Sequence, residues 1–452
     1  MNDIKHDIKK RHKNLSEFRY IAVGFFLTIL SGAIMLSLPF SSRDGQWTNF
    51  LDSLFTATSA TCVTGLVVFD TFRHWSIIGQ LVILVLIQIG GMGFISIGVA
   101  FSMLLHKKIG LRQRDLMQES VNALEIGGIV RLFSVIIRGT FLIEGIGAVL
   151  LAIRFIPDFG ILRGIYFSVF HSISAFCNAG FDLMGINEEY SSFTKYVADP
   201  LVNITIMLLI IIGGIGFTIW NEVRIKKFKL SRYSLHAKIV ISTTLILVFG
   251  GGLFMYIFEK NNTIAGMDTP GAVFASLFGS VTARTAGFNT VDTAALTPES
   301  KLLTIVLMFI GGSPGSTAGG IKTTTVVFHD IPLPSKRGCN GCNVFGRKIS
   351  SEVIKKAGMV LIINLVLGLT AVIAILATSN MEMDDVLFEV YSAISTVGMT
   401  TGITRDLNTV GRIIIIIMMY CGRIGSMTFV LSFVHRPDKA NIELPEEKVI
   451  IG

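Results

Sequence analysis

The sequence has little charge and few cysteines, prolines and tryptophans. Only 15% of its 452 residues are charged, against roughly a quarter in a soluble globular domain. Hydrophobic residues make up 51%. This balance excludes an ordinary soluble protein and indicates that most of the surface faces lipid. Five scattered cysteines are too few for a disulfide framework. The net charge of +8 would suit nucleic-acid binding. Where the charges lie along the chain shows whether that function is needed to explain them.

Eight hydrophobic segments are long enough to cross the roughly 30 Å hydrocarbon core of a membrane. They cover residues 20–40, 77–105, 132–156, 201–220, 239–258, 302–328, 353–378 and 413–434. Between the two members of each pair lies a shorter apolar run with the length expected of a re-entrant segment: 50–60, 165–176, 272–283 and 386–395. The first span follows basic residues but is too long for a signal-peptide core, so we expect a retained membrane helix.

One construction occurs four times, namely an apolar run that enters a small-residue turn ending on glycine. The turns end at Gly65, Gly180, Gly287 and Gly398, about a quarter of the chain apart. We predict an all-α polytopic membrane protein in which four pseudo-symmetric repeats of span, pore helix, filter and span surround one central pore. The repeats are 20–105, 132–221, 239–328 and 353–434, with cytosolic linkers 106–131, 222–238 and 329–352 and cytosolic ends 1–19 and 435–452.

Charge is distributed unequally between the two sides of the predicted membrane. Most of the 39 Lys and Arg residues lie in the two ends and the linkers, whereas acidic residues are in excess in the pore-helix segments. This pattern follows the positive-inside rule and explains the basic charge without nucleic acid. The basic linkers are also suited to anionic lipid or to an acidic partner, and the rule alone requires neither.

The glycine turns suit a monovalent cation that has left water. Such an ion needs replacement oxygens, and rings of backbone carbonyls supply them. Consecutive carbonyls face one side only in conformations that a Cβ resists, which glycine permits. The predicted filter residues are Val63, Thr64, Gly65, Asn178, Ala179, Gly180, Thr285, Ala286, Gly287, Thr396, Val397 and Gly398.

The third closing span has a composition that should break a helix. Residues 311–325 contain five glycines and a proline. Irregular backbone at membrane depth is tolerated only where protein or a water-filled cavity covers it, so we predict a flexible loop that lines the pore. The fourth closing span carries Arg423, a charge inside a predicted span. It can oppose a passing cation, or it can anchor structure by pairing with a carboxylate or with loop carbonyls.

These features resemble the Trk, Ktr and plant HKT superfamily of potassium transporters, and the short N-terminus is most similar to the Ktr ion-translocating subunit. The resemblance implies a homodimer in a bacterial cell membrane, resting on a cytosolic ring of nucleotide-binding RCK subunits. It implies K⁺ as the transported ion, with Na⁺ possible and no cofactor in this chain. It also places a gate below the filter, at Ser313, Gly315, Ser316, Thr317, Gly319, Gly320, Lys322 and Arg423.

Other functions fit the sequence less well. A sodium-coupled secondary transporter with alternating access would use inverted repeats and alternate the sidedness of charge, which these repeats do not. An enzyme would need a catalytic set inside the spans, and the nearest candidate, Glu144 with Arg138, is expected to be a structural pair. The segment before Lys322 only approximates a phosphate-binding loop.

Four further side chains have simpler expected roles. Cys339 and Cys342 could form half a zinc site or a redox pair, but a solvated linker is the expectation. His171 is expected in the core. Arg284 is expected to pair with Asp292 or Glu389 and brace the filter.

Overall fold

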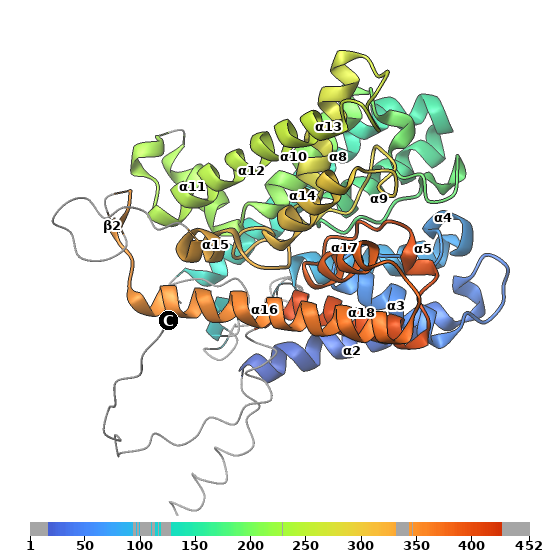
Figure 1. The fold of residues 1–452 in the computed structure, drawn as a ribbon, viewed down its shortest axis with the longest axis horizontal. Helices are drawn as coiled ribbons and strands as arrows, with labels where there is room; N and C mark the ends of the chain where they lie inside the picture. Colours follow the sequence, from blue (N-terminus) through green and yellow to red (C-terminus); the bar gives the residue numbers. More distant parts are fainter. Residues whose placement is uncertain are drawn as a thin grey trace, which may run out of the picture.

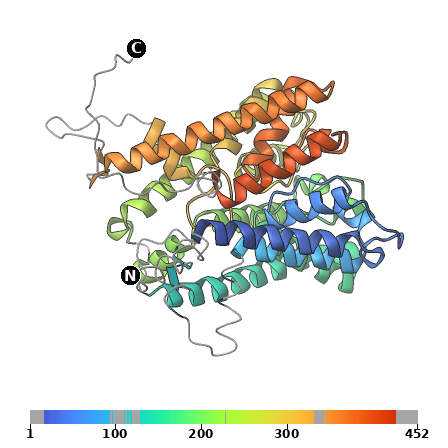
Figure 2. The ribbon, with the colours of Figure 1, turned by 90° about the horizontal axis from the view of Figure 1, so that it is seen from below.

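The computed structural model describes residues 17–93, 128–227, 229–330, 343–345 and 347–426, and isolated positions 96, 99, 110, 114, 115, 117 and 118. This part of the chain is mostly helical, and its long helices run side by side along the long axis of the molecule (Figures 1 and 2). The described residues leave out Cys339 and Cys342. They also leave out most of the linkers 106–131 and 329–352 and nearly all of both ends of the chain.

Each repeat opens with a long helix. These are α2 (Glu17–Ser37), α8 (Ile129–Phe159), α12 (Leu235–Glu259) and α16 (Ser351–Thr378). Within the described residues these four helices are long and apolar enough to cross a membrane, and a bent pair, described below, can make a fifth. Much of their surface is apolar and not covered by other parts of the protein, as at Phe141, Leu142 and Phe249.

A shorter helix follows in each repeat and points into the protein. The four are α3 (Phe50–Thr61), α9 (Ile161–Phe176), α13 (Thr269–Thr282) and α17 (Met383–Ile394). Asn49 caps α3 by accepting a hydrogen bond from the Leu51 N–H at 2.8 Å, and Pro270 lies in the first turn of α13, where a missing N–H costs nothing. Their C-terminal ends are buried and lead directly into the glycine turns.

The closing helices are α5 (Ile77–Met92), α10 (Pro200–Gly214), α14 (Pro298–Phe309) and α18 (Thr409–Ile424). The sequence pointed to a break in the third closing span, and the structure has a helix end inside all four predicted closing spans. The other three also stop at a glycine in the left-handed region, with φ of 78° at Gly93, 104° at Gly216 and 95° at Gly425. Glycine ends the helix there because residues with a Cβ rarely adopt this conformation.

The segment that follows the break is described in the second and third repeats, and it differs between them. In the second repeat it continues as α11 (Phe217–Lys226), bent by 97° from α10. In the third repeat a loop separates α14 from α15 (Thr323–Asp330). The remaining elements are short: η1 (Pro39–Ser41), α4 (Thr71–His74), η2 (Met184–Ile186), η3 (Thr194–Tyr196), η4 (Leu230–Arg232), η5 (Ile403–Arg405), and the antiparallel strands β1 (Asn343–Val344) and β2 (Arg347–Lys348).

Candidate ion-conducting site

The four glycine turns share one unusual backbone conformation. The residue two before each glycine has a positive φ, at 52° for Val63, 59° for Asn178, 75° for Thr285 and 52° for Thr396. Each glycine has one too, at 97°, 69°, 82° and 92° along the chain. Positive φ is uncommon for residues with a Cβ. Its recurrence at the same position in four repeats therefore marks one shared local structure.

The turns meet edge to edge in a closed ring. A Cβ added to Gly65 would lie 2.6 Å from the carbonyl oxygen of Ala179, and one added to Gly180 would lie 2.7 Å from that of Ala286. In the same way Gly287 lies against the carbonyl of Val397, and Gly398 against that of Thr64. Each repeat therefore touches the next at these glycines, and the fourth touches the first. Only glycine fits at these positions.

The residues just before the glycines are held by the end of each pore helix. The N–H groups of Thr64, Ala179 and Val397 each donate to a serine carbonyl 2.8 Å away, five residues earlier. In the third repeat the Ala286 N–H donates to the Thr282 carbonyl at 2.9 Å, one residue closer. The carbonyls of these four residues are the ones that approach the neighbouring glycines, so the ring presents oxygen and no fixed anion.

Hydroxyl groups brace the turns and were not predicted from the sequence. The Ser59 and Ser392 hydroxyls accept hydrogen bonds from the N–H groups of Gly65 and Gly398, both at 3.0 Å. The Ser174 and Thr282 hydroxyls donate to the carbonyls of Phe181 and Phe288 at 2.7 and 2.6 Å. A serine six residues before the glycine in three of the four turns was the signal that could have revealed them.

Two pore-helix side chains at equivalent positions support the segment after the filter. His171 and Glu389 each lie nine residues before their glycine and are fully buried. The His171 ring contacts the Phe167 carbonyl at 2.7 Å and accepts from the Leu183 N–H at 3.0 Å, so its predicted core position is confirmed. Glu389 accepts hydrogen bonds from the hydroxyls of Thr400 and Thr404.

The predicted pairing of Arg284 with Asp292 or Glu389 is wrong. Arg284 is buried and points toward α12, where its nearest described hydrogen-bond partner is the Thr244 hydroxyl at 3.5 Å. Glu389 points instead to the segment that follows Gly398. The two side chains therefore have separate partners, which the sequence alone cannot show.

The predicted pair of Glu144 with Arg138 is also not formed. The Glu144 carboxylate accepts from the side-chain amide of Gln88 on α5, at 3.1 and 3.3 Å, and Cys177 lies beside it. Arg138 is on the exposed surface of α8. Glu144 therefore ties the opening helix of repeat 2 to the closing helix of repeat 1, directly behind a filter turn.

The loop of the third repeat folds back on itself and on α10. Ile310 and Ile321 form a parallel bridge that closes it. The N–H groups of Ser313 and Thr317 donate to the carbonyls of Gly214 and Gly213, at 3.0 and 3.2 Å. These carbonyls end α10 and lack partners within their own helix. The loop thus occupies the place that a continuing helix would take.

The same loop lies against the filter turns. The Thr317 hydroxyl donates to the Phe176 carbonyl at 3.2 Å. A Cβ on Gly319 would overlap the Thr396 side chain, and one on Gly320 would lie 3.0 Å from the Ser395 carbonyl. Within the loop, Ser316 donates to the Ser313 carbonyl at 2.6 Å. The predicted gate residues are therefore brought together with the predicted filter residues.

Arg423 of the fourth repeat contacts the loop of the third repeat and the closing helix of the first. Its guanidinium donates to the Thr317 carbonyl of the loop, and to the carbonyls of Gly90 and Gly91 at the end of α5. No described carboxylate pairs with it, so the contact is the loop-carbonyl anchor. Lys322 likewise binds carbonyls, of Ala318 at 2.7 Å and Gly319 at 3.2 Å, and forms no ion pair within the described chain.

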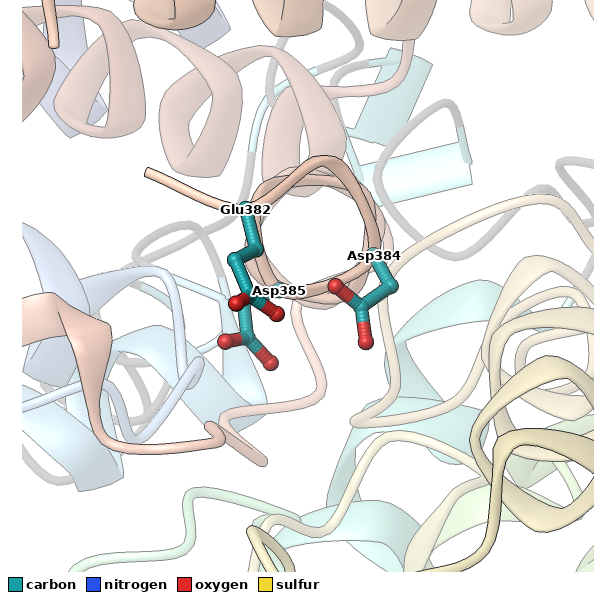
Figure 3. Close-up of side chains that lie close together, drawn as sticks. All are labelled: Glu382, Asp384 and Asp385. Atoms are coloured by element: carbon teal, nitrogen blue, oxygen red, sulfur yellow. The ribbon is translucent and has the colours of Figure 1, made fainter. Parts of the chain in front are cut away.

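A group of acidic side chains stands at the start of α17, away from the ring. Glu382, Asp384 and Asp385 have carboxylate oxygens within 4.8 Å of one another, and Figure 3 shows Asp384 on the other side of the helix from Glu382. Lys301 of α14 pairs with Asp384 at 3.4 Å and with Asp385 at 3.2 Å. The group is thus partly neutralised and joins two helices.

Comparison with known proteins gives consistent results over the whole chain. The family model described as "TrkH: Cation transport protein" matches residues 9–444. The chain is 39% identical to the potassium/sodium uptake protein NtpJ of Enterococcus hirae, over 98% of this chain and 99% of that protein. It is 41% identical to the Ktr system potassium uptake protein B of Bacillus subtilis, over 96% of each chain.

A solved structure has the same fold. The crystal structure of the potassium transporter TrkH from Vibrio parahaemolyticus superimposes with a TM-score of 0.72, at 18% sequence identity, and covers 93% of this chain and 85% of that one. The predicted all-α architecture is confirmed by this match.

Proposed function

Because the chain belongs to the TrkH family of cation transport proteins, we propose that it is the ion-translocating membrane subunit of a bacterial potassium uptake system of the Ktr type. The observation that carries this proposal is the closed ring of Gly65, Gly180, Gly287 and Gly398. A ring of neutral backbone carbonyls replaces the water around a monovalent cation and suits neither an anion nor a catalytic reaction.

The filter in this proposal consists of the twelve turn residues named above. The four carbonyls that touch the neighbouring glycines supply one layer of oxygens, and the alternating backbone conformation directs further carbonyls to the same side. K⁺ passes through this ring from the outer mouth. A relative named for both potassium and sodium uptake makes Na⁺ a second ion to test.

The gate in this proposal is the loop 311–325 together with Arg423. The loop is held by backbone hydrogen bonds to the ends of other helices, which are few and can exchange for water when the loop moves. Arg423 fastens the loop through the Thr317 carbonyl. Its positive charge also opposes a cation that has passed the filter. Opening therefore requires the loop and the guanidinium to separate.

The proposed assembly is a homodimer in the cell membrane with both termini in the cytosol. A cytosolic ring of nucleotide-binding RCK subunits would control the gate, and no cofactor is expected in this chain. The relative from Bacillus subtilis is named as one component of a system, which supports a regulatory partner here. The basic cytosolic linkers offer that partner a charged surface.

Rescue of a potassium-uptake-deficient bacterium tests the proposal. The chain is expressed with its cytosolic partner, and K⁺ and Na⁺ uptake are read separately. The wild type is expected to restore growth on low potassium, and Gly398→Ser to lose the preference for K⁺ because its side chain would meet the Thr64 carbonyl.

The matched control is Gly250→Ser, since Gly250 has open space around it. It should behave as wild type. A Gly398→Ser protein with unchanged K⁺ and Na⁺ uptake would contradict the filter, and failure of the wild type to move K⁺ would contradict the function.

A further inference from the structure

A cavity of about 360 Å³ lies where α11 crosses the beginning of α8. Arg131 and Gly128 line it from α8, and Asn221, Arg224 and Ile225 line it from α11. No residue of the filter turns or of the proposed gate lines this cavity.

The break in the second closing helix creates this cavity. Gly216, with φ of 104°, turns the chain by 97° and sends α11 away from the direction of α10. Phe217 and Trp220 then pack against Ile129 and Phe133 of α8. A Cβ on Gly139 would lie 3.2 Å from the Trp220 ring, which shows how close the two helices are. The cavity is beside this apolar contact.

Two guanidinium groups, those of Arg131 and Arg224, line the cavity. Neither Arg131 nor Arg224 forms an ion pair with any described acidic residue. Glu222, the acid nearest in sequence to Arg224, is already engaged by Lys226 at 3.2 Å and by the Ser234 N–H at 3.0 Å. The first turn of α8 adds to the positive character, because its cap residue Gly128 has no side chain to accept from the free N–H groups.

Apolar side chains lie beside the two arginines: Ile129, Leu132 and Ile225 also line the cavity. Ile225 borders the cavity with 68% of its surface exposed, and the lipid-facing side of α8 continues from the same end with exposed residues such as Phe141. A ligand for this place needs an anionic group of phosphate size and apolar chains beside it. Two arginines suit phosphate because each presents a planar fork of donors.

We propose that this cavity binds the phosphate of an anionic phospholipid of the cytosolic leaflet. The lipid phosphate lies between Arg131 and Arg224, and the acyl chains follow the exposed apolar surface of α8. Basic pockets between membrane helices on the cytosolic side are known to suit such headgroups.

Binding at this point has a direct route to the gate. The N–H of Phe217, the first residue of α11, donates to the Gly315 carbonyl of the loop at 2.7 Å. A lipid that joins α11 to α8 therefore also steadies one contact of the loop. This regulatory consequence and the assignment to the cytosolic leaflet rest on the proposed function, whereas phosphate binding between Arg131 and Arg224 does not.

Lipid retention measured by native mass spectrometry tests the site. The full chain is reconstituted in nanodiscs of phosphatidylcholine with phosphatidylglycerol and then released from them. The wild type is expected to retain phosphatidylglycerol, and the double variant Arg131→Gln/Arg224→Gln to retain it roughly tenfold less. The control Lys229→Gln/Arg232→Gln removes two exposed charges nearby, outside the cavity, and should retain it as the wild type does.

Three results would overturn the lipid site. Equal loss in both double variants would reduce it to general surface charge. Undiminished retention in Arg131→Gln/Arg224→Gln would show that the two arginines do not hold the lipid. Displacement of the lipid by millimolar inorganic phosphate would assign them to a soluble anion. Melting curves of all three proteins should coincide, since the altered side chains are exposed.

Rubidium uptake into liposomes separates this inference from the proposed function. Wild-type uptake should change with the phosphatidylglycerol content, and uptake by Arg131→Gln/Arg224→Gln should not. Equal dependence in both proteins would overturn the link to the gate. A wild type that retains lipid but moves no ion in any membrane contradicts the function and leaves the lipid site standing.

Discussion

The third repeat differs from the other three at the point where the closing helix meets the pore turn. In repeats 1, 2 and 4 a helical glycine, at position 90, 213 or 422, lies directly against the carbonyl at the end of its own pore helix, that of Thr61, Phe176 or Ile394. In repeat 3 the equivalent Gly311 lies instead against its own loop, with the Gly319 carbonyl 2.8 Å from an added Cβ.

This difference separates a fixed part of the molecule from a part that can move. Three closing helices are locked to the filter by close backbone packing, which tolerates no added atom. In the third repeat, the loop 311–325 stands in this place and is held to the neighbouring repeats by a few hydrogen bonds. Selection by the ring and control by the loop can therefore be altered separately.

The largest expected effect comes from filling the close contact in a locked repeat. Gly90→Ala would place a methyl group against the Thr61 carbonyl, so α5 must shift, at a cost of about 1–3 kcal/mol. Gly311→Ala places its methyl group 2.8 Å from the Gly319 carbonyl oxygen, so the loop backbone must shift while the packing of α14 on the filter stays the same. Thermal unfolding in detergent should show a large fall in melting temperature for Gly90→Ala and a small one for Gly311→Ala.

The control for this pair is Gly250→Ala on α12, where nothing lies within 4 Å of an added Cβ. Its melting temperature should match or exceed that of the wild type, because alanine favours a helix by up to about 1 kcal/mol. Equal destabilisation by Gly90→Ala and Gly311→Ala would remove the distinction between the repeats.

A smaller effect, on ion uptake, is expected at the contact between the loop and the pore helix of the second repeat. Thr317→Val removes the hydroxyl that donates to the Phe176 carbonyl, a bond worth about 1 kcal/mol. If that bond holds the closed state, uptake without the partner should rise about fivefold. Thr317→Ser keeps the hydroxyl and should remain close to wild type. A fall in uptake for Thr317→Val would show that the bond belongs to the open state.

The smallest effect should come from a change that makes the first filter turn resemble the filter turn of the third repeat. Ser59 holds the Gly65 N–H, and the third repeat has Val281 at the same distance before its glycine. Since that repeat forms its turn without this hydroxyl, Ser59→Ala should lower the preference for K⁺ over Na⁺ by only about twofold to threefold. Competition of Na⁺ with rubidium uptake measures it, with Ser31→Ala on α2 as the control.

The sequence predicted the repeating parts of this structure well because repetition is visible in residue spacing. Four glycines after four apolar runs revealed the turns, and the fold match confirms the helical architecture. The glycine-rich stretch 311–325 also revealed the loop. Both inferences needed only local rules about glycine and proline.

Contacts between repeats could not be predicted in this way. Arg284 and Glu389 lie beside neighbouring turns, yet Arg284 contacts Thr244 of α12 and Glu389 contacts Thr400 after the filter glycine. Glu144 prefers Gln88, a residue 56 positions away, to an arginine on its own helix. The breaks at Gly93, Gly216 and Gly425 were missed because a single glycine is also a common packing residue in membrane helices.

Ion flux into proteoliposomes tests the separation of filter and gate most directly. Initial rates of rubidium uptake, with K⁺ or Na⁺ as competitor, are compared for the wild type, Arg423→Ala and Gly398→Ser. Arg423→Ala should raise the rate and keep the preference for K⁺, because it frees the loop and leaves the ring intact. Gly398→Ser should lose the preference without a rise in rate. An altered preference in Arg423→Ala, or an unchanged one in Gly398→Ser, would contradict the account.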